Sequence, residues 1–215
     1  MKYCFDANSI SLEQLKERIC SADLVPSREP ILANLDEHLK SLESMGIKTL
    51  GGLRKELKDN KRLFAIAEQT GIDKDYLALL RREFESYFPK PFPLKEFEWI
   101  PIEEISRLEG VGIRNTADLF ENPDKVQNSG IQPDHGRHLL QCADLTRIQW
   151  ISPVSARMLT ETGYETPAKV ATANPEELDK ALDTVNTENN YFKGKIGLRD
   201  IKRLIHAARY VSNWY

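Results

Sequence analysis

Five basic residues near the C-terminal end of the chain are the strongest candidates for binding chemistry. They are Lys193, Lys195, Arg199, Lys202 and Arg203, and they span a glycine-containing loop and the start of the last predicted helix. Lysine and arginine side chains beside a glycine turn are suited to contacts with the phosphates of a nucleic acid. Basic residues also cover the solvent-facing side of ordinary amphipathic helices, so a plain solvated surface is the alternative interpretation.

A second candidate site combines two histidines and a cysteine. His135, His138 and Cys142 have a spacing that places all three on one face of a helix, as metal ligands require. The same pattern is explained without a metal if Pro133 or Asp134 opens the helix and Cys142 packs inward. Because no fourth ligand is evident, we predict neither a metal nor a cofactor.

The common catalytic patterns are missing from the sequence. We find no Ser-His-Asp order with a nucleophile turn, no glycine loop ending in Lys-Ser/Thr, no His-Glu-x-x-His and no Cys-x-x-Cys. The adjacent carboxylates at 103–104 and 176–177 fall in the first turns of predicted helices, where the helix dipole explains them. We therefore predict that the protein is not an enzyme.

The elements that position these residues are predicted by a phrase that recurs three times. Segments starting at residues 33, 97 and 148 each contain glycine, an apolar or aromatic residue, any residue, and then Thr or Asn. A glycine with apolar residues directly after it and four positions before it is typical of a Schellman cap, and Thr or Asn is a favoured N-cap. The phrase thus ends one helix and starts the next. The predicted caps are Gly46, Gly112 and Gly163, and the predicted starts are Thr49, Asn115 and Thr166.

One glycine pair resembles a DNA-binding hairpin when it is taken alone. Gly110 and Gly112 flank a valine, and Arg114 follows. In the repeat, however, Gly112 aligns with Gly163, so we interpret Gly112 as a helix cap.

The tryptophans are a further candidate because an indole can stack on a base. Trp99 and Trp150 align with each other in the repeat and fall at a turn between helices. We therefore expect them to pack in the core; Trp214 is the third tryptophan.

Residues 144–208 resemble the domain of unknown function 4332 family, a helix-hairpin-helix type of module. The resemblance implies a compact bundle of short helices related to modules of DNA repair and recombination proteins, but no established activity. In modules that hold DNA, glycines of the hairpin let the backbone approach a phosphate closely. The corresponding residues in Ile148-Gln149-Trp150-Ile151-Ser152 are Trp150 and Ser152, which argues against phosphate binding at this turn.

These observations predict an all-α fold of tandem helix-hairpin-helix or SAM-like units, as three degenerate repeats. We predict an N-terminal helix and loop over residues 1–30 and a first helical unit over 31–88. A proline-rich linker over 89–94 then leads to a second unit over 95–145 and a third, family-like unit over 146–215. Three prolines at alternating positions of the linker favour an extended chain.

Composition narrows the function and the partners. The net charge is −3 and no segment has a clear basic excess, unlike most proteins that bind mainly to phosphates. Three separated cysteines, no signal peptide and no membrane-spanning stretch predict a cytoplasmic protein without membrane contact. We predict a non-catalytic protein-interaction or adaptor module with an unidentified protein partner. The alternative is a module that binds nucleic acid, DNA in particular, non-specifically through its backbone phosphates; the sequence leaves the oligomeric state open.

Overall fold

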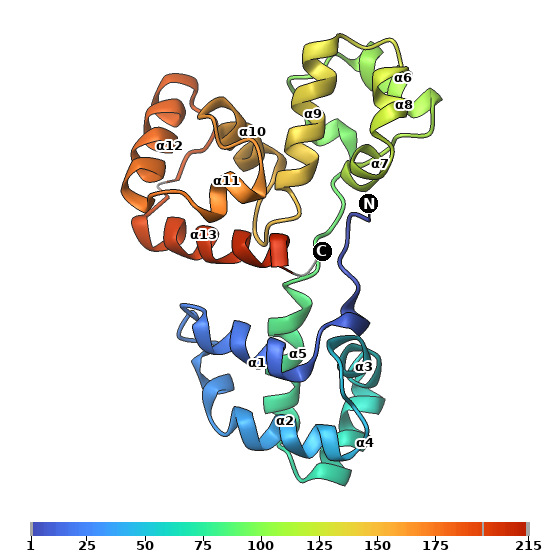
Figure 1. Cartoon of the computed structure of the whole chain (residues 1–215), viewed down its shortest axis with the longest axis vertical. Helices are drawn as coiled ribbons and strands as arrows, with labels where there is room; N and C mark the ends of the chain where they lie inside the picture. The colour runs from blue at the N-terminus through green and yellow to red at the C-terminus, as the bar shows by residue number, and fades with distance from the viewer. Residues whose placement is uncertain (1, 195, 214–215) are drawn as a thin grey trace. The chain divides into compact units, whose positions relative to one another are not determined.

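The computed structural model describes residues 2–194 and 196–213, and these residues form helices and connecting turns without a named strand (Figure 1). Two compact units are present, and each is described by itself. We call residues 5–88 the N-terminal unit, and residues 2–4 together with 89–213 the C-terminal unit. The all-α prediction is confirmed.

Five α-helices build the N-terminal unit around a core in which Leu77, Leu80 and Phe84 are fully buried. These three residues recur at helical spacing on α5, which explains why one face of that helix faces the core. The helices are α1 (Leu12–Ser21), α2 (Leu35–Ser44), α3 (Leu50–Glu56), α4 (Asn60–Thr70) and α5 (Lys74–Glu85), with 3-10 turns at Ala7–Ser9 and Glu29–Leu32.

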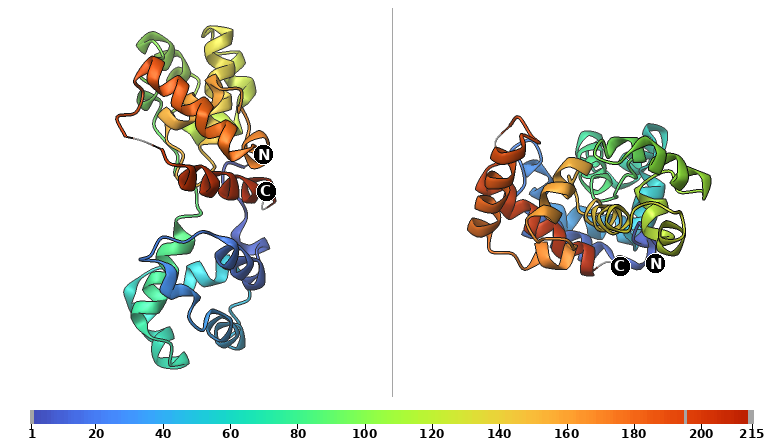
Figure 2. Two further views of the ribbon diagram at one scale, coloured as in Figure 1. Left: turned by 90° about the vertical axis from the view of Figure 1, so that its left-hand side faces the viewer. Right: turned by 90° about the horizontal axis from the view of Figure 1, so that it is seen from above.

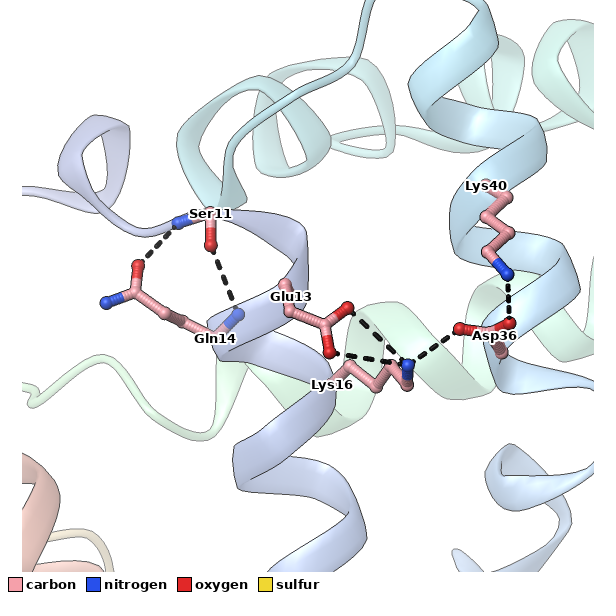
Figure 3. Close-up of polar contacts among 6 residues, drawn as sticks. All are labelled: Ser11, Glu13, Gln14, Lys16, Asp36 and Lys40. Carbon is pink, nitrogen blue, oxygen red and sulfur yellow. Dashed lines mark hydrogen bonds and ion pairs between the residues drawn. The ribbon is translucent and has the colours of Figure 1, made fainter.

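The start of α1 is held by a reciprocal pair of hydrogen bonds (Figure 3). The backbone N–H of Gln14 donates to Ser11 Oγ at 3.2 Å, and the N–H of Ser11 donates to Gln14 Oε1 at 2.9 Å. This capping box satisfies two backbone donors that a helix start would otherwise leave unpaired.

A lysine of α1 reaches a carboxylate of α2 in the same view. Lys16 Nζ lies 2.7 Å from Asp36 Oδ1, and Lys40 Nζ lies 2.6 Å from Asp36 Oδ2 (Figure 3). Because both ammonium groups hydrogen-bond to the carboxylate, the pKa of Asp36 is lowered to about 2. Asp36 therefore remains an ionised link between α1 and α2 over the whole neutral and mildly acidic range.

Eight α-helices of the C-terminal unit share one continuous cluster of buried apolar side chains, from Leu94 to Val211. Helix α9 packs on α7 and on α10, and α13 lies alongside α11 and α12 (Figure 2). The predicted second and third units thus contribute to the same core. The helices are α6 (Ile102–Gly110), α7 (Thr116–Glu121), α8 (Pro123–Gln127), α9 (Pro133–Leu145), α10 (Pro153–Glu161), α11 (Pro167–Ala171), α12 (Pro175–Asn189) and α13 (Leu198–Asn213), with a 3-10 turn at Leu94–Glu96.

The proline-rich segment runs extended beside the start of α7. The N–H of Leu94 donates to the carbonyl of Arg114 at 3.2 Å, and the N–H of Thr116 donates to the carbonyl of Phe92 at 2.9 Å. Pro93 lies between these two bonds, opposite Asn115, where its missing N–H does not interrupt the pairing. The prolines therefore keep this segment extended, and one of its edges pairs with the backbone of residues 114–116.

The three predicted cap glycines have left-handed backbones, with φ of 87° at Gly46, 86° at Gly112 and 86° at Gly163. After each glycine, the next backbone N–H donates to the carbonyl five residues earlier, which is the long bond of a Schellman cap. These bonds join Ile47 to Leu42 at 3.2 Å, Ile113 to Leu108 at 2.9 Å and Tyr164 to Leu159 at 2.9 Å.

The three predicted helix starts carry side-chain caps. Thr49 Oγ1 accepts from the N–H of Gly52 at 3.1 Å, and Thr166 Oγ1 accepts from the N–H of Lys169 at 3.2 Å. Asn115 Oδ1 accepts two backbone N–H groups, at 2.9 and 3.0 Å. The short segment between each cap glycine and the next N-cap therefore sets the angle between consecutive helices.

Replacing Gly163 by valine is expected to lower the free energy of unfolding by about 1 kcal/mol or more, because a β-branched residue strongly disfavours positive φ. A Cβ atom at Gly163 would meet no heavy atom within 4 Å, so the loss would come from the backbone conformation and not from a clash. Chemical denaturation measures the effect. Gly163→Asn is the control and should lose less, since asparagine tolerates this conformation; equal stability of the valine variant and the wild type would contradict the assignment.

Candidate functional site

The turn between α9 and α10 exposes a tryptophan. Trp150 is 58% exposed and has φ of 72°, a left-handed conformation that L residues other than Asn and Asp rarely adopt. The expectation that Trp150 packs in the core is therefore wrong. The reason lies in its neighbours: Ile148 and Ile151 turn inward, and the tight reversal between them directs the indole to solvent.

Trp99 differs from Trp150 although the two residues align in sequence. Trp99 is partly buried, with its ring centroid 4.4 Å from the His138 ring and 6.3 Å from the Phe97 ring. It is packed against the hydrophobic core of the C-terminal unit. For Trp99, the expected packing role is the observed one.

A cavity of about 320 Å³ opens beside Trp150, between α10, α12 and α13. This volume is at the lower end of the range of small-molecule sites, roughly 300–1,000 Å³. Its walls are mostly apolar, and the exposed rings of Trp150 and Phe192 stand among its lining residues. The main wall residues are Met158, Leu159, Leu182, Ile201 and Leu204.

Arg203 is the only cation among the residues that line this cavity in the described part of the chain. Its guanidinium carbon lies 4.6 Å from the centre of the Trp150 ring, within the range of a cation–π contact. Its side chain is 20% exposed, and its nearest described carboxylate oxygen is on Asp200, 3.9 Å from Nη1. Nε of Arg203 is buried and has no hydrogen-bond partner among the residues that the structure describes.

The other basic residues of the predicted set lie outside the cavity lining. Lys193, Arg199 and Lys202 are exposed, the first in the loop before α13 and the other two on α13 itself. Lys195 lies outside the described residues. The structure therefore separates Arg203, which is half-buried under an indole, from cations that face solvent.

The histidines and the cysteine of the second candidate site have structural contacts. His135 Nδ1 lies 2.8 Å from the buried carboxylate of Glu104, and His138 Nε2 hydrogen-bonds to the hydroxyl of Thr160. Burial lowers the pKa of His138 and raises the pKa of the fully buried Cys142 thiol to about 12. No group of three or more potential metal ligands occurs within residues 2–194 and 196–213.

The glycine pair that resembled a DNA-binding hairpin lies at a helix end. Gly110 is the last residue of α6, and Gly112 is the left-handed cap residue that follows it. This pair is therefore part of a helix cap in the second predicted unit. Neither residue belongs to the turn that contains Trp150.

Sequence reasoning missed the cavity and the contact between Arg203 and Trp150. One available signal pointed to the strained turn, because Trp150 occupies the place of a hairpin glycine, and a glycine there commonly reflects a positive φ. No comparable signal predicted the cavity, since its walls come from three helices and two connecting segments that only tertiary packing brings together.

Fold and site together define an all-α protein with an apolar cavity, an exposed tryptophan and a half-buried arginine. The chain belongs to the family described as Domain of unknown function (DUF4332), which it matches over residues 100–211. No curated protein and no solved structure matches the chain. The matched range begins just before α6 and ends within α13, so it includes the whole cavity.

Within the described residues, no helix combines the length and the apolar character that crossing a membrane requires.

Proposed function

We propose that this protein is a non-catalytic interaction or adaptor module that binds another protein through the surface around Trp150. This Trp150 surface consists of Trp150 and Phe192, which line the same cavity and are 58% and 47% exposed. Large apolar side chains gathered on a surface mark interaction sites, and tryptophan dominates binding energy at protein interfaces. The observation that carries the proposal is the exposed indole on a left-handed backbone.

The backbone strain supports a role in binding and argues against a role in stability. A left-handed conformation costs an L residue roughly 1–2 kcal/mol, and an exposed indole recovers little of this by burial. Strained, exposed residues of this kind are concentrated at binding sites.

Several features favour a protein partner over a nucleic acid. The net charge is −3, and no glycine is present at the turn where close phosphate approach would be required. We also propose a cytoplasmic location, because the three cysteines, Cys4, Cys20 and Cys142, are far apart in the sequence and odd in number.

Non-specific binding to nucleic-acid phosphates is the second candidate, favoured by the exposed Lys193, Arg199 and Lys202 around the start of α13. Fluorescence anisotropy with labelled DNA and RNA at two salt concentrations tests it. Binding that weakens steeply with salt, and that is lost when Arg199, Lys202 and Arg203 become alanine, would establish this candidate. Absence of binding at low salt would eliminate it.

The protein-interaction proposal is tested by affinity capture from an extract of the source organism with three versions of the full chain. Proteins recovered in stoichiometric amounts with the wild type are expected to be lost with Trp150→Gly, which removes the indole and suits the backbone. Ile102→Ala is the matched control, because Ile102 is a 67% exposed apolar residue of the same unit, on α6. The Ile102→Ala variant should retain the partner. Equal recovery of the partner with Trp150→Gly and with the wild type would show that the Trp150 surface is not the interface.

A further inference from the structure

We infer that the cavity beside Trp150 is a binding site for a small organic anion with a planar, aromatic body. The inference goes beyond the proposed protein interaction, although it shares Trp150 and Phe192 with that surface. It is carried by three features that meet at one place: apolar walls, an incompletely paired arginine and two exposed aromatic rings.

The walls select an apolar ligand body. Met158 and Leu159 from α10, Leu182 from α12 and Leu204 from α13 line the cavity on different sides. Filling such a space with an aromatic group removes apolar surface from water, which stabilises the complex by roughly 25 cal/mol per Å². Few polar groups line the cavity, which is typical of small-molecule sites in which a small number of polar contacts set the orientation.

Arg203 selects an anion. Its Nε is buried without a hydrogen-bond partner in the described part of the chain, and a buried donor left unpaired is unfavourable. The Asp200 carboxylate is 60% exposed and only approaches Nη1, at 3.9 Å. A carboxylate on the ligand can accept from two N–H groups of the guanidinium together, the paired geometry that guanidinium favours.

The two rings select a planar ligand. Trp150 and Phe192 both line the cavity and are 58% and 47% exposed, so part of each ring is available for stacking. Arg203 already lies over the indole, which places the cation beside the aromatic surface. An aromatic carboxylate can therefore contact the rings with its body and Arg203 with its charged end.

The test compares two probes of equal shape, 2-naphthoate and the neutral 2-naphthamide, titrated into the full chain by calorimetry. We expect naphthoate to bind about tenfold more tightly or better, because only naphthoate pairs with the guanidinium. Arg203→Met should bind both probes equally. Arg209→Met, on the same helix and outside the cavity lining, is the matched control and should keep the preference.

Binding is localised by amide chemical shifts, which should change mainly in residues 149–204, with circular dichroism showing that the Arg203→Met variant is folded. The inference is overturned if neither probe binds at millimolar concentration, if Arg203→Met keeps the preference, or if the shifts cluster elsewhere. Failure of the two proposals is distinguishable. If naphthoate does not bind but Trp150→Gly still abolishes capture of the partner, only the ligand site is rejected. If naphthoate binds but Trp150→Gly recovers the partner as well as the wild type does, only the protein interface is rejected.

Discussion

Replacing Tyr3 by alanine is expected to lower the free energy of unfolding of the C-terminal unit by about 3–5 kcal/mol, the range for removing a buried aromatic side chain. Tyr3 is 2% exposed, although it is the third residue of the chain. Its ring meets the Phe120 ring edge to face, with centroids 6.1 Å apart. Removing it would leave a cavity and would also break a buried hydrogen-bond chain.

That chain joins the N-terminus to two helices of the C-terminal unit. The hydroxyl of Tyr3 donates to Thr146 Oγ1 at 3.0 Å and accepts from Thr116 Oγ1 at 3.1 Å, while its backbone N–H donates to Glu121 Oε1 at 2.9 Å. Tyr3→Phe is the matched control, because it keeps the ring and removes the hydroxyl. It should lose about 1–3 kcal/mol, since Thr116 and Thr146 would lose a buried partner.

Hydrogen exchange followed by mass spectrometry is the suitable measurement, because it reports the loss of protection helix by helix and so compares the two units in one experiment. Peptides from α7 and α9 should lose protection in Tyr3→Ala, and peptides from α4 should not. Unchanged protection in α7 and α9 would contradict the docking of residues 2–4.

The same contact carries a pH dependence. Burial raises the pKa of the Tyr3 hydroxyl above its ordinary value of 10.0, with its two threonine partners opposing the shift. A raised pKa means that the unfolded chain loses this proton first as the pH rises. The stability that depends on the protonated hydroxyl of Tyr3 is therefore complete below pH 10 and is lost progressively as the pH rises from there through the raised pKa of the folded state.

Helix ends could be predicted from the sequence because capping is local chemistry. The cap at Gly163 depends on residues within five positions of it, and the capping box of Ser11 depends on Gln14 alone. Both devices can be read from a short window.

The place of Tyr3 could not be predicted in this way. Its partners Thr116 and Thr146 are more than a hundred residues away, and the first residues of the chain show no helical or strand periodicity. Residues 1–30 are predicted from the sequence as one segment, whereas residues 2–4 belong to the C-terminal unit. Tertiary packing alone decides this assignment.

The candidate site was predicted in part. Arg203 is one of the five basic residues that the sequence singles out, but their pattern indicates only a cationic helix face. Its position beside the cavity depends on how α10, α12 and α13 are arranged around that cavity, which no local pattern encodes. Trp150 was expected to share the environment of Trp99 because the two align, but the packing around each indole differs.

Substitution of the two aligned tryptophans should therefore change the stability by different amounts. Trp99→Ala is expected to lower the free energy of unfolding by about 2–3 kcal/mol, somewhat less than the roughly 3–5 kcal/mol for a fully buried tryptophan, because Trp99 is partly exposed. Trp150→Gly should change it by less than about 1 kcal/mol. Loss of the contact with Arg203 and the higher chain entropy of glycine in the unfolded state both lower the stability. Glycine adopts the left-handed backbone without strain, and this gain offsets the two losses.

A third variant isolates the energetic cost of the left-handed backbone at residue 150. Trp150→Ala removes the same ring contacts as Trp150→Gly but keeps a Cβ at φ of 72°, so it should be less stable than the glycine variant by about 1 kcal/mol. Urea denaturation of the three variants and the wild type gives all the differences on one scale. An alanine variant as stable as the glycine variant would mean that Trp150 is not strained. The proposed binding role of Trp150 would then be supported by its exposure alone.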